Sequence, residues 1–140
     1  MTIRIERVAN PGETERAAIL KPLRAYNLSQ AGSSAPESFA LLVHDEQSGE
    51  IVGGLSGSIT YRWLFIELLA IQPHTRNDGT GSRLLTMAEE IAREQGCIGM
   101  WLDTFDFQAP AFYEKHGFSK FGQLEDFPLH HARFFYQKRL

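Results

Sequence analysis

The fold of the chain is decided by residues 64–85, which read LFIELLAIQPHTRNDGTGSRLL. The first part, Leu64 to Ile71, is an almost continuous apolar run with one acid, Glu67, and such a run is typical of a strand buried on both faces. Pro73 ends strand pairing because it has no N–H. From Gly81 onward the apolar residues recur at helical spacing. The stretch therefore predicts a buried strand, a tight loop and a helix.

The loop between this strand and this helix has the composition of an anion site. The first N–H groups of a helix have no partner inside the helix, and the aligned peptide dipoles place partial positive charge there. Gly79 and Gly81 let a phosphate approach the backbone closely, and Arg76 can bind phosphate oxygens. A glycine-containing turn between two core elements is the alternative. A P-loop is excluded because no lysine follows the glycines, and a dinucleotide fingerprint because Leu84 replaces the third small residue.

Two motifs together resemble those of the GNAT N-acetyltransferase superfamily. The pattern Arg76-x-x-Gly79-x-Gly81 is similar to the family's acetyl-CoA pyrophosphate loop, Arg/Gln-x-x-Gly-x-Gly/Ala, which directly follows a strand ending in a Pro-containing turn. A second stretch, APAFYEKHGF at residues 109–118, resembles the family signature Ala-x-x-x-Tyr-Glu-Lys-x-Gly-Phe. The motifs occur in the family's order, and the resemblance in element order covers nearly the whole chain. It is closest in pattern to uncharacterised bacterial members of the small-molecule type.

The resemblance implies acetyl-CoA as cosubstrate and no metal. The family's strand splays to admit the pantetheine arm, so a backbone N–H near Leu69 to Ile71 would hold the oxyanion. Two positions depart from the family: Asp78 stands where a Lys or Arg is frequent, and Asp106 replaces a CoA-contacting asparagine. The residues expected to bind the cofactor are Leu69, Ala70, Ile71, Arg76, Asn77, Asp78, Gly79, Thr80, Gly81, Ser82, Gln108 and Tyr113.

The same resemblance suggests two catalytic residues. Tyr113 matches the tyrosine that faces the CoA sulfur and acts as general acid toward the departing thiolate; alternatively it is a core residue with its hydroxyl satisfied. Glu67 matches a strand position where several members carry a glutamate base that often works through water. A partly desolvated carboxylate there would have a raised pKa; alternatively Glu67 is exposed or salt-bridged. Asp103, on the next predicted strand, is the second candidate for the base.

Bulk properties exclude several classes of function. The length of 140 residues predicts one domain, residues 1–140, with a substantial core. The net charge of −3, without a Lys/Arg run, argues against nucleic acid as a partner. No stretch approaches the roughly 20 apolar residues of a membrane span. Cys97, the single cysteine, cannot form an intrachain disulfide and fits a reducing compartment. We therefore expect a cytoplasmic protein with no membrane partner.

Periodicity and turn residues predict an α/β (mixed α+β) chain. Pro22 should kink or divide the first helix, which makes the expected order β-α-α-β-β-β-α-β-α-β-β. Antiparallel strands around one βαβ unit require a mixed sheet of six to seven strands flanked by helices. The expected strands are residues 2–8, 38–44, 50–61, 64–71, 98–105, 118–125 and 132–138, and the expected helices are residues 13–28, the segment from 81 onward and residues 111–116.

These observations predict an acetyl-CoA-dependent N-acetyltransferase that moves an acetyl group directly to a primary amine of a small molecule. Two alternatives stay open. The acceptor could be a protein lysine or N-terminal amine, or the chain could be a non-catalytic acyl-CoA-binding module, because a fold alone does not determine function. Dimerisation is common in the family, and an exposed strand near the C-terminus is compatible with a homodimer.

Overall fold

The computed structural model describes residues 1–33, 35–75 and 79–140, which divide into two units, Met1–Ser34 and Ala35–Leu140. In the first unit one helix, α1 (Glu13–Ala31), begins where the Gly12 N–H donates to Glu15 Oε1 at 3.2 Å. Acidic residues in a first helical turn suit the helix dipole. The helix runs continuously through Pro22, so the prediction of two helices is wrong.

The strand predicted at residues 2–8 is also absent from the described structure. Alternating apolar and polar side chains favour a strand only where a neighbouring strand completes its backbone hydrogen bonds. Residues 1–33 contain no strand that could serve as this neighbour. The alternating pattern alone is therefore not sufficient for strand formation within this unit.

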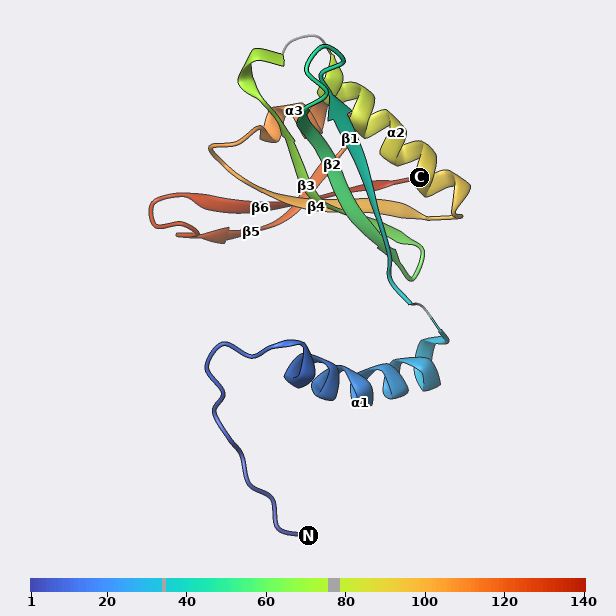
Figure 1. Ribbon diagram of the computed structural model, residues 1–140, viewed down its shortest axis with the longest axis vertical. Coiled ribbons are helices and arrows are strands. Elements are labelled where there is room, and N and C mark those ends of the chain that lie inside the picture. Colours follow the sequence, from blue (N-terminus) through green and yellow to red (C-terminus); the bar gives the residue numbers. More distant parts are fainter. Residues whose placement is uncertain (34, 76–78) are drawn as a thin grey trace. The chain divides into compact units, whose positions relative to one another are not determined.

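The second unit is a six-stranded mixed sheet with the order β1-β2-β3-β4-β6-β5 (Figure 1). All neighbours pair antiparallel except β3 and β4, which are parallel and are joined by a helix, as a parallel pair requires. This confirms the predicted α/β class and mixed sheet. The elements are β1 (Glu37–His44), β2 (Ile51–Thr60), β3 (Trp63–Ile71), the short 3₁₀ helix η1 (Pro73–Thr75), α2 (Thr80–Glu94), β4 (Gly99–Phe105), α3 (Pro110–Lys115), β5 (Ser119–Glu125) and β6 (Ala132–Arg139).

The core of this unit lies between α2 and one face of the sheet. The helical period predicted from Gly81 onward is confirmed, because its apolar positions are the buried ones. On the sheet, Leu64 is fully buried and the side chains of neighbouring strands surround it. The buried residues of α2 are Leu84, Leu85, Ala88 and Ala92, and the largest fully buried sheet residues are Leu55, Leu64, Met100, Leu102 and Tyr136.

Strand β3 is buried on one face and half-buried on the other only in its first half. Gly57 of β2 pairs with Ile66 and Ser56 pairs with Leu68, so Glu67 is the extra residue of a β-bulge. Glu67 is exposed, and Leu68 is 65% exposed. The prediction of a strand buried on both faces is therefore wrong beyond Ile66, where the bulge turns the strand outward.

Three glycines, Gly53, Gly54 and Gly57, lie inside β2, where glycine often marks a bulge or a close approach of backbones. At Gly57 a methyl group would collide with the carbonyl oxygen of Phe65, and at Gly53 with that of Ala70. Both neighbours are backbone atoms of β3, which cannot move without breaking the ladder. The close approach is confirmed.

Among the described residues, no helix is both long and apolar enough to span a bilayer.

We predict that Gly57→Ala lowers the free energy of unfolding by about 3 kcal/mol, because the added methyl group overpacks a site bounded by backbone. Gly122→Ala is the matched control: Gly122 also lies in a strand, and a methyl group added there would have no described neighbour within 4 Å. Urea denaturation of both variants measures the difference. Equal stabilities for the two variants would contradict the proposed constraint.

Candidate active site

The candidate site lies where the two parallel strands separate. In the described sheet the β3–β4 ladder consists of four pairs, from Trp63 with Gly99 to Ile66 with Leu102. Beyond these pairs β3 continues into η1 and then toward α2, while β4 continues toward α3 (Figure 1). In an open α/β sheet, ligands bind at the carboxyl ends of parallel strands. The geometry thus brings both sequence motifs to one edge of the sheet.

The first turn of α2 carries the glycines of the first motif. Gly79 is the N-cap residue with a left-handed φ of 81°, and its carbonyl oxygen accepts the first intrahelical bond, from the Arg83 N–H at 3.0 Å. In the described residues no side chain caps this helix. The helix therefore begins with its dipole and backbone N–H groups at the separation of the strands. The predicted residues Arg76, Asn77 and Asp78 lie outside the described residues.

Helix α3 packs directly against this turn. The Nε2 atom of His116 and the Oγ atom of Ser82 lie 2.9 Å apart, within hydrogen-bonding distance. A methyl group on Gly81 would lie 3.2 Å from the ring of Phe112, so any larger residue at position 81 would push the two helices or this ring slightly apart. The two motifs, about thirty residues apart in sequence, are therefore in contact.

His116 is the functional candidate that sequence reasoning missed. Burial, followed by the positive charges of Lys115 and Lys138, lowers the pKa of its imidazole. Its position in the second motif carries no residue preference, so nothing in the sequence indicated the contact with Ser82. The side chain is half-buried and lies at the end of α3.

Tyr113, the predicted general acid, is buried in the aromatic core. Its ring lies 5.3 Å from that of Phe112 and 6.1 Å from that of Phe118, measured between ring centroids. Burial, with a smaller contribution from the charge of Asp103, raises the pKa of Tyr113 to about 12. The hydroxyl therefore stays protonated at any working pH. It suits a hydrogen-bond donor to a developing thiolate.

The predicted base, Glu67, is an exposed residue on the β3 bulge. Its expected partial desolvation is not seen. The described contacts connect it to none of the other predicted site residues. The second candidate, Asp103, is bound by Arg133, whose Nε and terminal nitrogen lie 3.0 and 2.8 Å from Asp103 Oδ1. Of the two carboxylates, Glu67 is the one without such an ion pair in the described structure.

Leu69, Ala70 and Ile71 form the part of β3 that extends beyond the ladder with β4. On the other side they remain paired with β2, from Leu55 to Gly53. Leu69 and Ile71 are partly buried against the core, whereas Ala70 is exposed. This segment therefore borders the separation of the strands while β2 holds it in place.

Two polar residues after β4 have structural partners. The Oε1 atom of Gln108 accepts hydrogen bonds from Thr104 Oγ1 and the Phe105 N–H, both at 2.8 Å. Asp106 accepts from the Ala132 N–H at 3.0 Å, and its other oxygen lies 3.0 Å from His131 Nδ1. Gln108 shapes the loop before α3, and Asp106 joins the end of β4 to the start of β6.

Aromatic rings surround Arg133 on the face of the sheet opposite α2. The guanidinium carbon lies 5.0 Å from the ring centroid of Phe127 and 5.6 Å from that of Phe135. Because Asp103 binds it as well, the guanidinium of Arg133 has two aromatic rings and a carboxylate as partners. The sequence alone gives no sign that Arg133 lies among these rings. In the part of the chain that the structure describes, no three His, Cys, Asp or Glu residues cluster as a metal site would need.

Comparisons with known proteins identify the family of the chain. The model of the Acetyltransferase (GNAT) family matches residues 6–118. Acetyltransferase Atu2258 of Agrobacterium fabrum is 38% identical over 112 residues, with 80% of both chains covered. Blasticidin-S acetyltransferase of Streptomyces morookaense is 39% identical over 115 residues, covering 81% of this chain and 82% of its own.

A solved structure shows the same fold at high similarity. The crystal structure of an acetyltransferase from Bacillus cereus superimposes with a TM-score of 0.85 at 38% identity, covering 96% of this chain and 98% of that one. Family model, relatives and solved structure all indicate the same family. The chain therefore belongs to the GNAT family and is an acetyltransferase.

Proposed function

We propose that this acetyltransferase uses acetyl-CoA and transfers the acetyl group directly to a primary amine of a small molecule. The observation that carries the proposal is the contact between the two motifs. The first turn of α2, through Gly81 and Ser82, touches α3, the helix that holds Tyr113. An anion bound at this turn would place the rest of the donor near Tyr113.

The donor would bind along the edge formed by α2 and the end of β3. Gly79, Thr80, Gly81 and Ser82 are the described residues of the first turn, where backbone N–H groups and the helix dipole favour a pyrophosphate. The motif adds Arg76 with its neighbours Asn77 and Asp78. The pantetheine arm would pass Leu69 to Ile71, and Gln108 would face it from the loop before α3.

The chemistry needs one bond made and one broken. The amine nitrogen attacks the thioester carbonyl carbon, a C–N bond forms, and the C–S bond then breaks with its electron pair on sulfur. Glu67 takes the proton of the amine, through water. Tyr113 stabilises the thiolate by a hydrogen bond; complete transfer of its proton to a thiolate with a pKa of about 8.5 would be uphill by roughly 5 kcal/mol. This refines the expectation of a general acid.

A relative supports the proposed acceptor class. The name of the Streptomyces relative, blasticidin-S acetyltransferase, states a small-molecule acceptor, and that protein is 39% identical to this chain. The exposed carboxylate of Glu67 provides a negative charge that a cationic amine would approach. A small basic metabolite or antibiotic is therefore the acceptor to test first, with lysine peptides as the comparison.

The first prediction concerns the donor. Isothermal titration of the protein with acetyl-CoA should give micromolar binding, and Arg76→Ala should weaken it at least tenfold because a phosphate contact by arginine is lost. Arg93→Ala is the matched control, since Arg93 is an exposed arginine in the last turn of α2. Failure of the wild-type protein to bind acetyl-CoA would overturn the proposed function. Equal weakening by both variants would point to a general charge effect.

The second prediction concerns Tyr113. Tyr113→Phe keeps the buried ring and should lower kcat about a hundredfold through loss of one hydrogen-bond donor, while the Kd for acetyl-CoA stays within twofold. Because the pKa of Tyr113 is about 12, the ratio of wild-type to variant kcat should be constant from pH 7 to 10. A variant that turns over as fast as wild type would remove Tyr113 from the mechanism.

The third prediction separates the two candidate bases. Glu67→Gln should lower kcat/KM for the amine about a hundredfold with the KM for acetyl-CoA unchanged, as expected for loss of a general base. Glu90→Gln is the control and should have no effect, because Glu90 is an exposed carboxylate on α2. Full activity in Glu67→Gln together with a large loss in Asp103→Asn would assign the base to Asp103 instead.

A further inference from the structure

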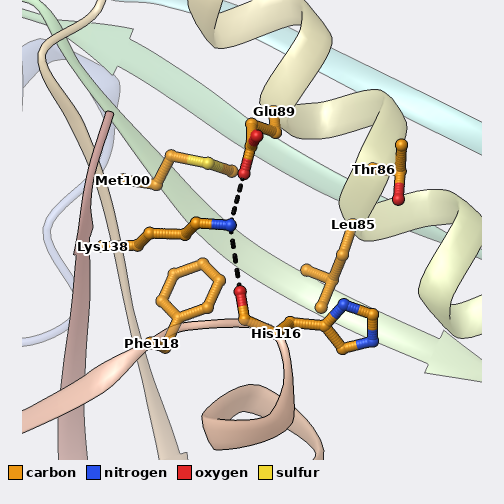
Figure 2. A pocket seen from close by; sticks show the side chains of 7 residues that line it. All are labelled: Leu85, Thr86, Glu89, Met100, His116, Phe118 and Lys138. Atoms are coloured by element: carbon orange, nitrogen blue, oxygen red, sulfur yellow. Dashed lines mark hydrogen bonds and ion pairs between the residues drawn. The ribbon is translucent and has the colours of Figure 1, made fainter.

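His116 is held at three points between α2, α3 and β6. Its backbone oxygen accepts a hydrogen bond from Lys138 Nζ at 3.0 Å, and the same Lys138 pairs with Glu89 of α2 at 2.6 Å (Figure 2). Its ring lies 4.9 Å from that of Phe112, and its Nε2 atom reaches Ser82 Oγ at 2.9 Å. The imidazole is therefore fixed in place beside the first turn of α2.

We propose that His116 is a positioning residue for the pyrophosphate of acetyl-CoA. It holds the Ser82 hydroxyl so that this hydroxyl donates a hydrogen bond to a phosphate oxygen. The inference rests on the donor site proposed above and adds a residue to it. Ser82 is the third residue of α2 and lies in the turn where the anion would bind. His116 would not touch the donor itself.

The reason lies in the proton count of the pair. A serine hydroxyl has one proton, and a neutral imidazole has one ring nitrogen that donates and one that accepts. If Nε2 accepts a hydrogen bond from Ser82, the Ser82 proton points to His116 and the hydroxyl cannot donate a hydrogen bond to the phosphate. If Nε2 carries the proton, it donates to Ser82 Oγ, and the Ser82 proton is free for the anion. A bound pyrophosphate therefore selects the second arrangement.

Charge couples this arrangement to pH. Among the described residues, the titratable and charged groups around the imidazole are Lys115 of α3, Lys138 of β6 and Glu89 of α2, which is paired with Lys138. Burial and the two lysines lower the pKa of His116, so it is neutral in the free protein at pH 7. Two negative phosphate charges nearby favour the imidazolium form, in which both ring nitrogens donate. Binding of acetyl-CoA should then take up a proton, and affinity should rise as pH falls from 8 to 6.

The surroundings of His116 permit substitutions at this position. A partly open pocket of about 140 Å³ borders His116, and its wall includes Leu85, Met100 and Phe118. A side chain of similar size can therefore be accommodated without overpacking. His116→Gln places an amide N–H near the position of Nε2 and cannot titrate, whereas His116→Phe keeps the ring and removes the hydrogen bond.

The test compares two acyl donors, acetyl-CoA and acetyl-pantetheine, which lacks the pyrophosphate and the nucleotide. His116→Phe should raise the Kd and KM for acetyl-CoA about tenfold, as for loss of a hydrogen bond to a charged group, with little change in kcat. The KM for acetyl-pantetheine should not change. Ser82→Ala should match His116→Phe, and the double variant should be no weaker than either. His116→Gln should restore affinity at pH 7 but lose its rise toward pH 6.

Each outcome decides the inference. An unchanged Kd for acetyl-CoA in both His116→Phe and Ser82→Ala overturns it. Equal losses with acetyl-CoA and acetyl-pantetheine show that His116 only supports the fold, and a persisting pH dependence in His116→Gln places the proton elsewhere. Failure of the wild-type protein to bind acetyl-CoA overturns the donor site and this inference together. If the wild-type protein binds acetyl-CoA and the variants bind it equally well, only this inference is overturned. Ser82→Ala and His116→Gln carry the test if His116→Phe does not fold.

Discussion

The short parallel ladder between β3 and β4 is the constraint on which the rest of the site depends. Parallel strands cannot be joined by a tight turn, so α2 must cross over one face of the sheet and begin at the carboxyl end of β3. The ladder stops at Ile66 and Leu102, and the bulge at Glu67 turns β3 away at the same level. The end of the ladder and the bulge together therefore produce an opening, an exposed acid at its margin and a helix N-terminus beside it.

The two helices at this opening are connected through side chains that serve both packing and chemistry. Gly81 lets the ring of Phe112 approach α2, and Ser82 meets His116 at hydrogen-bonding distance. Lys138 joins both helices to β6 through Glu89 and the His116 carbonyl oxygen. Because α3 also carries Tyr113, the same contacts that shape the proposed anion site hold the tyrosine in its buried environment. A high pKa and a fixed hydroxyl position thus have one common cause.

What the sequence predicted well depended on local signals. The spacing of Leu84, Leu85 and Ala88 placed α2 correctly, and the apolar run placed β3, because burial in a helix or strand follows its own period. Strand formation at residues 2–8, burial of Glu67 and division of α1 at Pro22 were wrong. Strand formation at residues 2–8 depends on a partner strand, and the exposure of Glu67 depends on a bulge set by the register with β2. Neither the partner nor the register can be read from the residues of the segment itself.

The contacts missing from the sequence analysis all join residues distant in the chain. Ser82 and His116 are in separate helices, Asp103 and Arg133 in neighbouring strands, and each became visible only through the fold. The two catalytic assignments and the cofactor residues rest on the resemblance of the motifs. For Arg76, Asn77 and Asp78 the motif is the sole argument, since they lie outside the described residues.

Arg133 changes how the aromatic residues around the opening are understood. A cluster of rings without a cation would be a natural cage for a positively charged acceptor. Here Arg133 already lies over Phe127 and Phe135, and Asp103 neutralises it. Under the proposed function, a cationic amine would find this cage filled and its carboxylate engaged. Its counter-charge would then be Glu67 on the bulge, and the ammonium would have to lose one proton to solvent before its nitrogen attacks and passes the second proton to Glu67 through water.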